Sequence, residues 1–205
     1  IIGASTATES PLNLSIAHGE ERGSAVALAR EYFGPTLPCR VHEDVASVLQ
    51  DMQADAHCIG VLSADYPHHN DKLWWWQMPE STARQTYVFA RLPFVLFRRE
   101  ADDEPVFLAG NITPAPSGDD ASLYAVNMDL RDWTAEGVTV IHHCNHVNET
   151  LTLFEFNGWV LPNSEAHAGL LDALQKHGAL KKYGAPHNPT LHYLGSYAKP
   201  LTVNS

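Results

Sequence analysis

The sequence predicts an α/β protein in two consecutive parts, a parallel α/β part followed by a ferredoxin-like α+β part. Strand and helix alternate over the first sixty residues, and residues 121–205 have the order β–α–β–β–α–β. A segment rich in Pro, Gly, Ser and Asp, residues 113–120, separates the two parts. Strands that alternate with helices favour a parallel sheet, and β–α–β–β–α–β is the ferredoxin-like order. We therefore expect a first part over 11–112, a linker over 113–120 and a second part over 121–205.

The elements of the first sixty residues follow from apolar spacing. A helix over 43–53 is predicted because Val45, Val48, Leu49 and Met52 are spaced i, i+3, i+4 and i+7. The strand over 58–62 is apolar throughout, as expected when both faces of a sheet are covered. The other predicted elements are strands over 12–17 and 39–42 and a helix over 25–33 that Gly34-Pro35 ends.

The middle of the chain contains the aromatic run Leu73–Met78 and predicted strands over 85–92, 94–98 and 106–111. Trp74 and Met78 form an i, i+4 pair, so we favour core or interface packing for this run over stacking on an aromatic ligand. In the last part we expect strands over 122–128 and 190–197, at most two helical turns over 130–136, a hairpin of 138–144 with 151–160, and a helix over 163–182.

Composition excludes several classes of protein. The 205 residues are 44% hydrophobic and carry a net charge of -11, which disfavours nucleic acid and anionic membranes as partners. No apolar run approaches the roughly 18–20 residues of a membrane span. Three cysteines form no disulfide framework, so a reducing cytoplasm is expected. Neither a phosphate-binding glycine loop nor a nucleophile motif is present, so no cofactor is predicted.

Four potential metal ligands lie close together, and they are His142, His143, Cys144 and His146. On a strand, His142, Cys144 and His146 would share one face, which suits zinc. Structural zinc sites take four ligands from two separated pairs, and no second pair follows at regular spacing. We therefore predict no metal site here.

Four segments resemble one protein family. Ile1–Ala7 is similar to the end of a helix that enters from an upstream part, and Pro11–Gly34 to a first strand, glycine loop and helix. Cys39–Leu62 is similar to the next helix and strand, and Leu194-Gly195-Ser196-Tyr197 to a terminal leucine-glycine-serine-tyrosine motif. In these segments the chain resembles the C-terminal part of the P-protein family, in which chorismate mutase is fused to prephenate dehydratase and an ACT domain.

The resemblance implies an architecture and a setting. It implies a dehydratase-like α/β lobe of the periplasmic-binding-protein type 2 kind over 11–112, with a reduced second lobe, and an ACT-like domain over 121–205. It also implies a cytoplasmic homodimer in phenylalanine biosynthesis whose mutase part would precede Ile1. A small aromatic acid or amino acid is the ligand it suggests.

The sequence departs from the family at its functional motifs. The family's Thr-Arg-Phe motif is replaced by Pro105-Val106-Phe107, which retains neither the hydroxyl nor the cation. The two motifs that hold phenylalanine in the ACT domain are replaced by Asp129–Asp132 and His142–His146. Dehydration of prephenate needs a proton donor for the leaving hydroxyl and a cation for the dicarboxylate. We therefore favour a non-catalytic module with a regulatory, ligand-sensing or dimerising role, and assign no catalytic residue.

Two alternatives remain. The first is an active prephenate dehydratase with a relocated site, in which Ser24, Ser63 and Thr113 supply hydroxyls and Arg91 supplies the cation. The second is a small-molecule binding module that uses the same four candidate residues. Whether the chain is an enzyme is left open at this point.

Overall fold

The computed structural model describes residues 12–17, 24–64, 73–80, 84–97, 105–146, 149–180 and 189–203. The predicted upstream helix end at 1–10 therefore lies outside the described residues, and the link to a mutase stays a prediction. Among the described residues, every helix is too short or too polar to cross a membrane.

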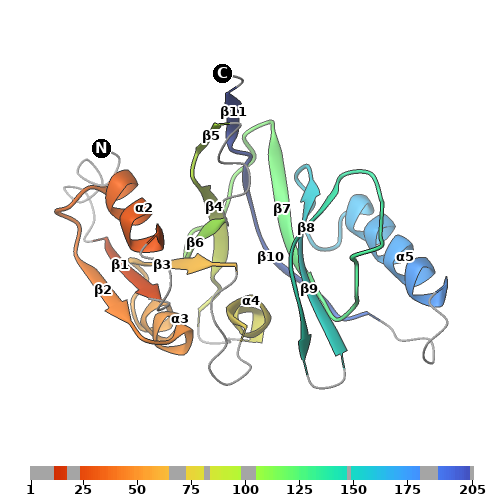
Figure 1. Ribbon diagram of the computed structural model, residues 1–205, viewed down its shortest axis with the longest axis horizontal. Coiled ribbons are helices and arrows are strands. Elements are labelled where there is room, and N and C mark those ends of the chain that lie inside the picture. The colour runs from red at the N-terminus through yellow and green to blue at the C-terminus, as the bar shows by residue number, and fades with distance from the viewer. Residues whose placement is uncertain are drawn as a thin grey trace.

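One sheet runs through the whole molecule (Figure 1). It has nine strands in the order β2-β1-β3-β6-β4-β10-β7-β9-β8, and a separate two-stranded ribbon pairs β5 with β11. The strands of the first half are β1 (Asn13–Ala17), β2 (Cys39–His42), β3 (Cys58–Ser63), β4 (Tyr87–Leu92), β5 (Val95–Phe97) and β6 (Val106–Gly110). Those of the second half are β7 (Asp120–Val126), β8 (Val138–His146), β9 (Glu149–Asn157), β10 (Leu191–Ala198) and β11 (Leu201–Val203).

Beside these strands, the described residues form four α-helices and one 3-10 turn. They are α2 (Ser24–Phe33), α3 (Val45–Ala54), α4 (Trp74–Gln77), α5 (Glu165–Leu180) and the 3-10 turn η1 (Met78–Glu80). Helix α3 begins at Val45 because the Asp44 side chain accepts a hydrogen bond from the Ser47 amide at 2.8 Å, which satisfies a free N–H of the first turn.

The start of the chain folds as the sequence predicts. β1 pairs in parallel with both β2 and β3, and α2 and α3 connect these strands. The sheet then becomes mixed, because β6 pairs antiparallel with both β3 and β4. β4 consequently runs in the same direction as β1 and β3, so the carboxyl ends of these three strands lie at the same edge of the sheet.

The second half has four neighbouring antiparallel strands, β10-β7-β9-β8. The predicted hairpin is confirmed as β8 and β9, but the predicted helical turns over 130–136 are wrong. There the Asp129 carboxylate accepts from the Arg131 amide at 3.0 Å, and the Trp133 amide donates to the Leu130 carbonyl at 3.0 Å. This local side-chain bond favours a turn over a helix.

The two halves meet where β10 pairs in parallel with β4, at Gly195 and Val88. On one face of the sheet, a single apolar core spans both halves beneath α3 and α4. Its members include Val48, Met52, Trp74, Trp75, Phe107, Leu123 and Leu153. The favoured interpretation of the tryptophan run is confirmed, since Trp74 and Trp75 are among the largest fully buried side chains.

The opposite face carries two separate cores, one beneath α2 and one beneath α5. Strand alternation separates the faces: Leu108 belongs to the α2 core, whereas its neighbours Phe107 and Ala109 belong to the core beneath α3 and α4.

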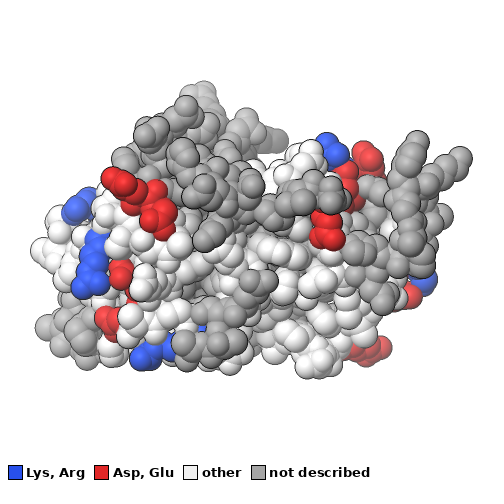
Figure 2. All heavy atoms as spheres, turned by 90° about the horizontal axis from the view of Figure 1, so that it is seen from below, with Lys and Arg blue, Asp and Glu red and all other residues white. Residues whose placement is uncertain are grey.

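Charge is distributed unevenly over the surface. On the face seen in Figure 2, basic side chains lie toward both ends of the molecule, near acidic ones, and most of the described atoms between them belong to uncharged residues. The described residues of this face therefore form no broad basic surface.

Candidate functional site

A buried charged cluster joins the two halves of the sheet. Arg91 of β4 donates from Nη1 to Oε1 of Glu155 in β9 at 2.7 Å, and the Tyr197 hydroxyl of β10 donates to the same oxygen at 2.6 Å. The side chains of Arg91 and Glu155 are 17% and 12% exposed, and Tyr197 is fully buried. We call these three residues the seam cluster.

Strand geometry explains how the seam cluster is assembled. Glu155 alternates with the buried residues Leu151 and Leu153, so all three face the core beneath α3 and α4. Arg91 lies opposite Phe107 in the β4–β6 register. The Phe107 ring lies 5.9 Å from the Tyr197 ring and 5.9 Å from the Trp74 ring. Aromatic side chains therefore pack beside the seam cluster.

Burial affects the protonation of Tyr197. Burial, together with the neighbouring Glu155 carboxylate, raises the pKa of the Tyr197 phenol well above its ordinary value. A phenol is protonated at neutral pH even at its ordinary pKa, so Tyr197 donates to Glu155, and burial extends this state to higher pH. Arg91 Nε is also buried, and it has no hydrogen-bond partner among the described residues.

Arg91 and Ser63, two of the four candidate residues, lie at the carboxyl edge of the sheet, near the ends of β4 and β3. Ligands of open α/β sheets bind outside this edge. The backbone oxygen of Ser63 accepts a hydrogen bond from the Trp74 indole at 2.8 Å, which anchors α4 there.

The other two candidates are placed differently. Thr113 follows the end of β6, and β6 runs antiparallel, so Thr113 lies beyond the opposite edge of the sheet and lines a pocket with Gln85 and Tyr87. Tyr87 and Arg91 pair with Gly110 and Phe107 of β6, three residues apart, so they are separated by roughly 10 Å along the sheet. Ser24 is the first residue of α2, and its side chain lies outside the described part. The structure thus brings Arg91 and Ser63 to one edge and Thr113 to the other.

The segment that replaces the family's Thr-Arg-Phe motif lies in the core. Val106 and Phe107 in β6 are 2% and 0% exposed, and they pack on opposite faces of the sheet. Neither side chain offers a hydroxyl or a charge.

The terminal motif Leu194–Tyr197 forms the junction between the halves. Leu194 is buried in the core, Gly195 contacts the β4 backbone, and Tyr197 belongs to the seam cluster. The Ser196 hydroxyl lies between those of Ser122 and Tyr193, at 2.8 and 2.9 Å.

Sequence reasoning missed Glu155 and Tyr197. The sequence does indicate a role for Glu155, because this carboxylate alternates with Leu151 and Leu153 on an apolar strand face. A carboxylate in such a place needs a buried partner. Nothing local identifies that partner as Arg91, which lies 64 positions earlier in the chain.

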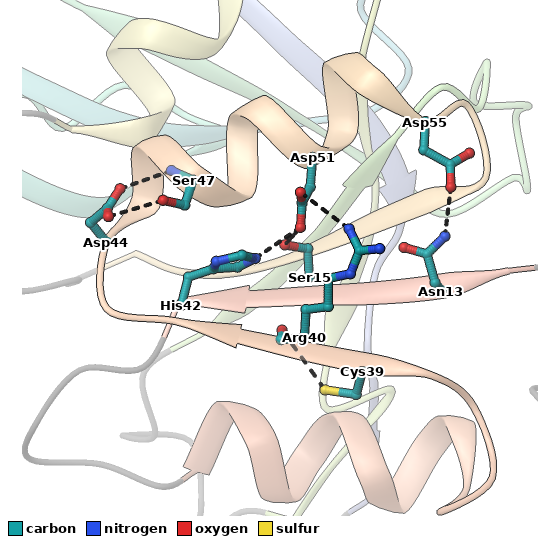
Figure 3. Close-up of polar contacts among 9 residues, drawn as sticks. All are labelled: Asn13, Ser15, Cys39, Arg40, His42, Asp44, Ser47, Asp51 and Asp55. Carbon is teal, nitrogen blue, oxygen red and sulfur yellow. Dashed lines mark hydrogen bonds and ion pairs between the residues drawn. The ribbon is translucent and has the colours of Figure 1, made fainter.

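A second polar cluster connects α3 to the edge strand β2 and to its neighbour β1. Figure 3 shows the Asp51 carboxylate of α3 pointing toward Ser15 of β1 and toward His42 and Arg40 of β2. Its Oδ2 atom lies 2.9 Å from the Ser15 hydroxyl and 2.8 Å from His42 Nε2, and Arg40 lies 3.5 Å from Oδ1.

This arrangement stabilises the fold and does not activate a nucleophile. Burial raises the pKa of Asp51, but the hydrogen bonds from His42 and Ser15 lower it by more, so the net direction is downward. Ser15 is fully buried and bonds to the carboxylate, whereas a catalytic serine would bond to the imidazole base.

The histidine-rich strand end lies in β8. The His142 ring lies 6.4 Å from the buried Trp75 ring, and Cys144 packs against the core beneath α4. The His146 side chain lies outside the described part. Within that part, no three His, Cys, Asp or Glu side chains are grouped as a metal site would require.

Comparison of sequences gives no relative. No family model matches the chain, and no curated protein matches it significantly.

Comparison of structures gives several solved proteins of similar fold. Prephenate dehydratase from Streptococcus mutans has a TM-score of 0.51 and 10% identity, and the match covers 92% of this chain and 98% of that one. Prephenate dehydratase from Arthrobacter aurescens in complex with L-Phe has a TM-score of 0.52 and 10% identity, covering 92% of this chain and 90% of that one.

A third similar structure is GqqA, described as a novel type of quorum quenching acylase. It has a TM-score of 0.52 and 12% identity, and the match covers 90% of this chain and 94% of that one. At such low identity these likenesses define the fold alone. The chain has a prephenate-dehydratase-like fold with a large mixed sheet.

Proposed function

We propose that this chain is a non-catalytic, prephenate-dehydratase-like module of aromatic amino-acid biosynthesis. It acts in the cytoplasm as a homodimer that senses a small aromatic acid or amino acid, with residues 121–205 as an ACT-like domain. The dehydratase fold supports the setting, and the L-Phe bound by the Arthrobacter aurescens protein supports the class of ligand. Because GqqA shares the fold and is described as an acylase, the fold alone does not select a reaction.

One observation carries the non-catalytic part of the proposal: Arg91 is already paired with Glu155 at 2.7 Å. A substrate dicarboxylate needs an unneutralised cation, and here it would meet the Glu155 carboxylate beside the guanidinium. A substrate that bound to Arg91 would displace the Glu155 carboxylate from it. That buried carboxylate would then lose its ion pair without gaining water, which costs free energy. Arg91 therefore acts as a structural cation.

The alternative of a relocated active site gains no support from the placement of the candidates. Of its hydroxyl candidates, Thr113 lies toward the opposite edge of the sheet from the cation Arg91. Ser63 lies at the same edge as Arg91, but Ser63 pairs with Val106 of the α2 face and Arg91 with Phe107 of the other face, so the two side chains project from opposite faces of the sheet. General acid catalysis requires the donor within hydrogen-bond reach of the leaving group while the cation holds the same small substrate.

The test is phenylpyruvate formation from prephenate by the full chain. We expect no turnover above the uncatalysed rate, with the Streptococcus mutans dehydratase as positive control in the same assay. Turnover near 1 s⁻¹ or higher, the ordinary range of enzymes, would overturn the proposal.

The ligand-sensing and dimer parts need separate measurements. Calorimetry with L-Phe, L-Tyr, prephenate and chorismate should give heat for at least one compound, and sedimentation velocity should give a dimer. Absence of heat for all four compounds would contradict the sensing role. Sedimentation as a monomer would contradict the homodimer.

A further inference from the structure

A pocket of about 510 Å³ lies at the amino-terminal ends of β4 and β10, where the two halves of the sheet meet. Three aromatic side chains, Tyr87 of β4, Tyr193 of β10 and Trp159 after β9, line it together with Thr113, Pro114 and Leu161. The rings of Tyr87 and Tyr193 lie 6.1 Å apart, and Tyr193 also packs on Tyr124 at 5.4 Å. This volume lies within the usual range of small-molecule pockets, roughly 300–1,000 Å³.

Among the residues that the structure describes, the lining of the pocket carries no Lys, Arg, Asp or Glu side chain. His192 contributes to the lining, and its ring packs edge-on against Trp76 of α4 at 4.6 Å. A carboxylate that entered this pocket would lose water and would meet no Lys or Arg side chain among these described residues. The pocket therefore favours an uncharged ligand, and its aromatic walls favour a planar ring.

A chain of hydrogen bonds fixes the direction of the Tyr193 hydroxyl. Ser122 has one hydroxyl hydrogen, and it donates that hydrogen to the Gly158 carbonyl at 2.8 Å. Ser196, 2.8 Å away, must then donate to Ser122, and Tyr193, 2.9 Å from Ser196, must donate to Ser196. Each hydroxyl in the chain uses its one hydrogen, so the Tyr193 oxygen keeps only accepting capacity for a ligand.

We propose that this pocket binds an uncharged aromatic molecule that donates one hydrogen bond, from N–H or O–H, to the phenol oxygen of Tyr193. The site differs from the seam cluster, since Tyr193 packs in the core beneath α5 and the seam cluster faces the core beneath α3 and α4. The proposal goes beyond the proposed function and holds whether or not the chain turns over prephenate.

Two matched pairs of probes test the chemistry by calorimetry on the full chain. Indole and benzofuran have the same bicyclic shape, but benzofuran has an oxygen in place of the N–H. We expect indole to bind roughly tenfold more tightly, the usual effect of one net hydrogen bond. Indole-3-ethanol should likewise bind at least about tenfold more tightly than indole-3-acetate, which differs by its carboxylate.

Variants of the chain locate the site. Tyr193→Phe keeps the ring and removes the oxygen, so it should abolish the preference for indole over benzofuran while benzofuran binding stays unchanged. Thr113→Trp should fill the pocket and weaken both probes at least about tenfold. Ala115→Trp is the matched control, because Ala115 is exposed in the same linker and does not line the pocket. Ala115→Trp should bind both probes as the wild type does.

Three results would overturn the proposal. The first is no indole binding at millimolar concentration, and the second is an unchanged indole preference in Tyr193→Phe. The third is wild-type binding by Thr113→Trp. Circular dichroism of each variant establishes that it is folded, and the dehydratase assay is scored separately, so the two proposals fail independently.

Discussion

Glu155 accepts hydrogen bonds from both sides of the junction between β4 and the second half. Its Oε1 atom bonds to Arg91 of β4 and to Tyr197 of β10, so one buried carboxylate satisfies two donors. Replacing such a pair by apolar groups of similar volume is often harmless, whereas removing one partner leaves an uncompensated buried charge. If the ion pair is structural, removing one partner should therefore lower the stability of the protein more than replacing both.

We predict that Glu155→Ala lowers the free energy of unfolding by about 3–5 kcal/mol, because the Arg91 guanidinium stays buried without its partner. The double variant Arg91→Met, Glu155→Leu should recover most of this loss. Urea denaturation followed by fluorescence measures both.

The control removes an exposed ion pair. Asp172 and Lys176 are neighbours on α5, and their side chains are 60% and 73% exposed, so Asp172→Ala should cost at most about 0.5 kcal/mol. A Glu155→Ala variant no less stable than Asp172→Ala would contradict the structural role of the seam cluster.

At the scale of elements, β10 approaches β4 more closely than any side chain would allow. A Cβ added at Gly195 would lie 2.0 Å from the Val88 carbonyl oxygen and 2.7 Å from its amide nitrogen. The register of β10 against β7 also shifts between Tyr193 and Gly195. The glycine of the terminal motif is therefore required by backbone contact between two strands.

Gly195→Ala should therefore destabilise the protein by about 3 kcal/mol or more, since a backbone neighbour cannot move aside as a flexible side chain can. Gly169→Ala is the matched control. It lies exposed in α5 with nothing within 4 Å of the added atom, and should stabilise the helix by about 0.5–1 kcal/mol. Equal effects of the two substitutions on thermal unfolding would refute this account of Gly195.

Most elements were predictable because their signals are local. The strand at Cys39–His42 matches its predicted bounds, and the helices at Ser24–Phe33 and Val45–Ala54 match within two residues. The prediction of at most two helical turns over 130–136 was wrong, because the Asp129 carboxylate accepts a hydrogen bond from the Arg131 amide and favours a turn there. The strand Leu201–Val203 was missed because it forms only by pairing with β5.

At the scale of the whole molecule, one sheet and one core cross the predicted boundary. The segment 113–120 lies between β6 and β7, as a linker would, although its last residue, Asp120, already belongs to β7. The core beneath α3 and α4 contains Val88 and Phe107 from one half and Leu123 and Leu153 from the other. The division into two domains stays a prediction, and the shared core argues for folding as one unit.

We expect thermal unfolding of the full chain to show one transition, with tryptophan fluorescence and far-ultraviolet circular dichroism changing together. Residues 121–205 expressed alone should bind a hydrophobic dye or aggregate, because Leu123, Leu153 and Tyr197 would lose their cover. Two separated transitions, or a soluble and cooperative fragment, would contradict a shared core.

Most of the elements, the parallel start of the sheet and the hairpin of the second half could be predicted from the sequence alone, because apolar spacing and turn residues act over a few positions. The sequence also indicated Arg91 and Thr113 as candidate ligand-binding residues. Only the tertiary structure decided that Arg91 is neutralised by Glu155 and that Thr113 borders an uncharged aromatic pocket. These contacts join segments that lie dozens of positions apart, and their chemistry depends on burial, which exists only after the sheet has assembled.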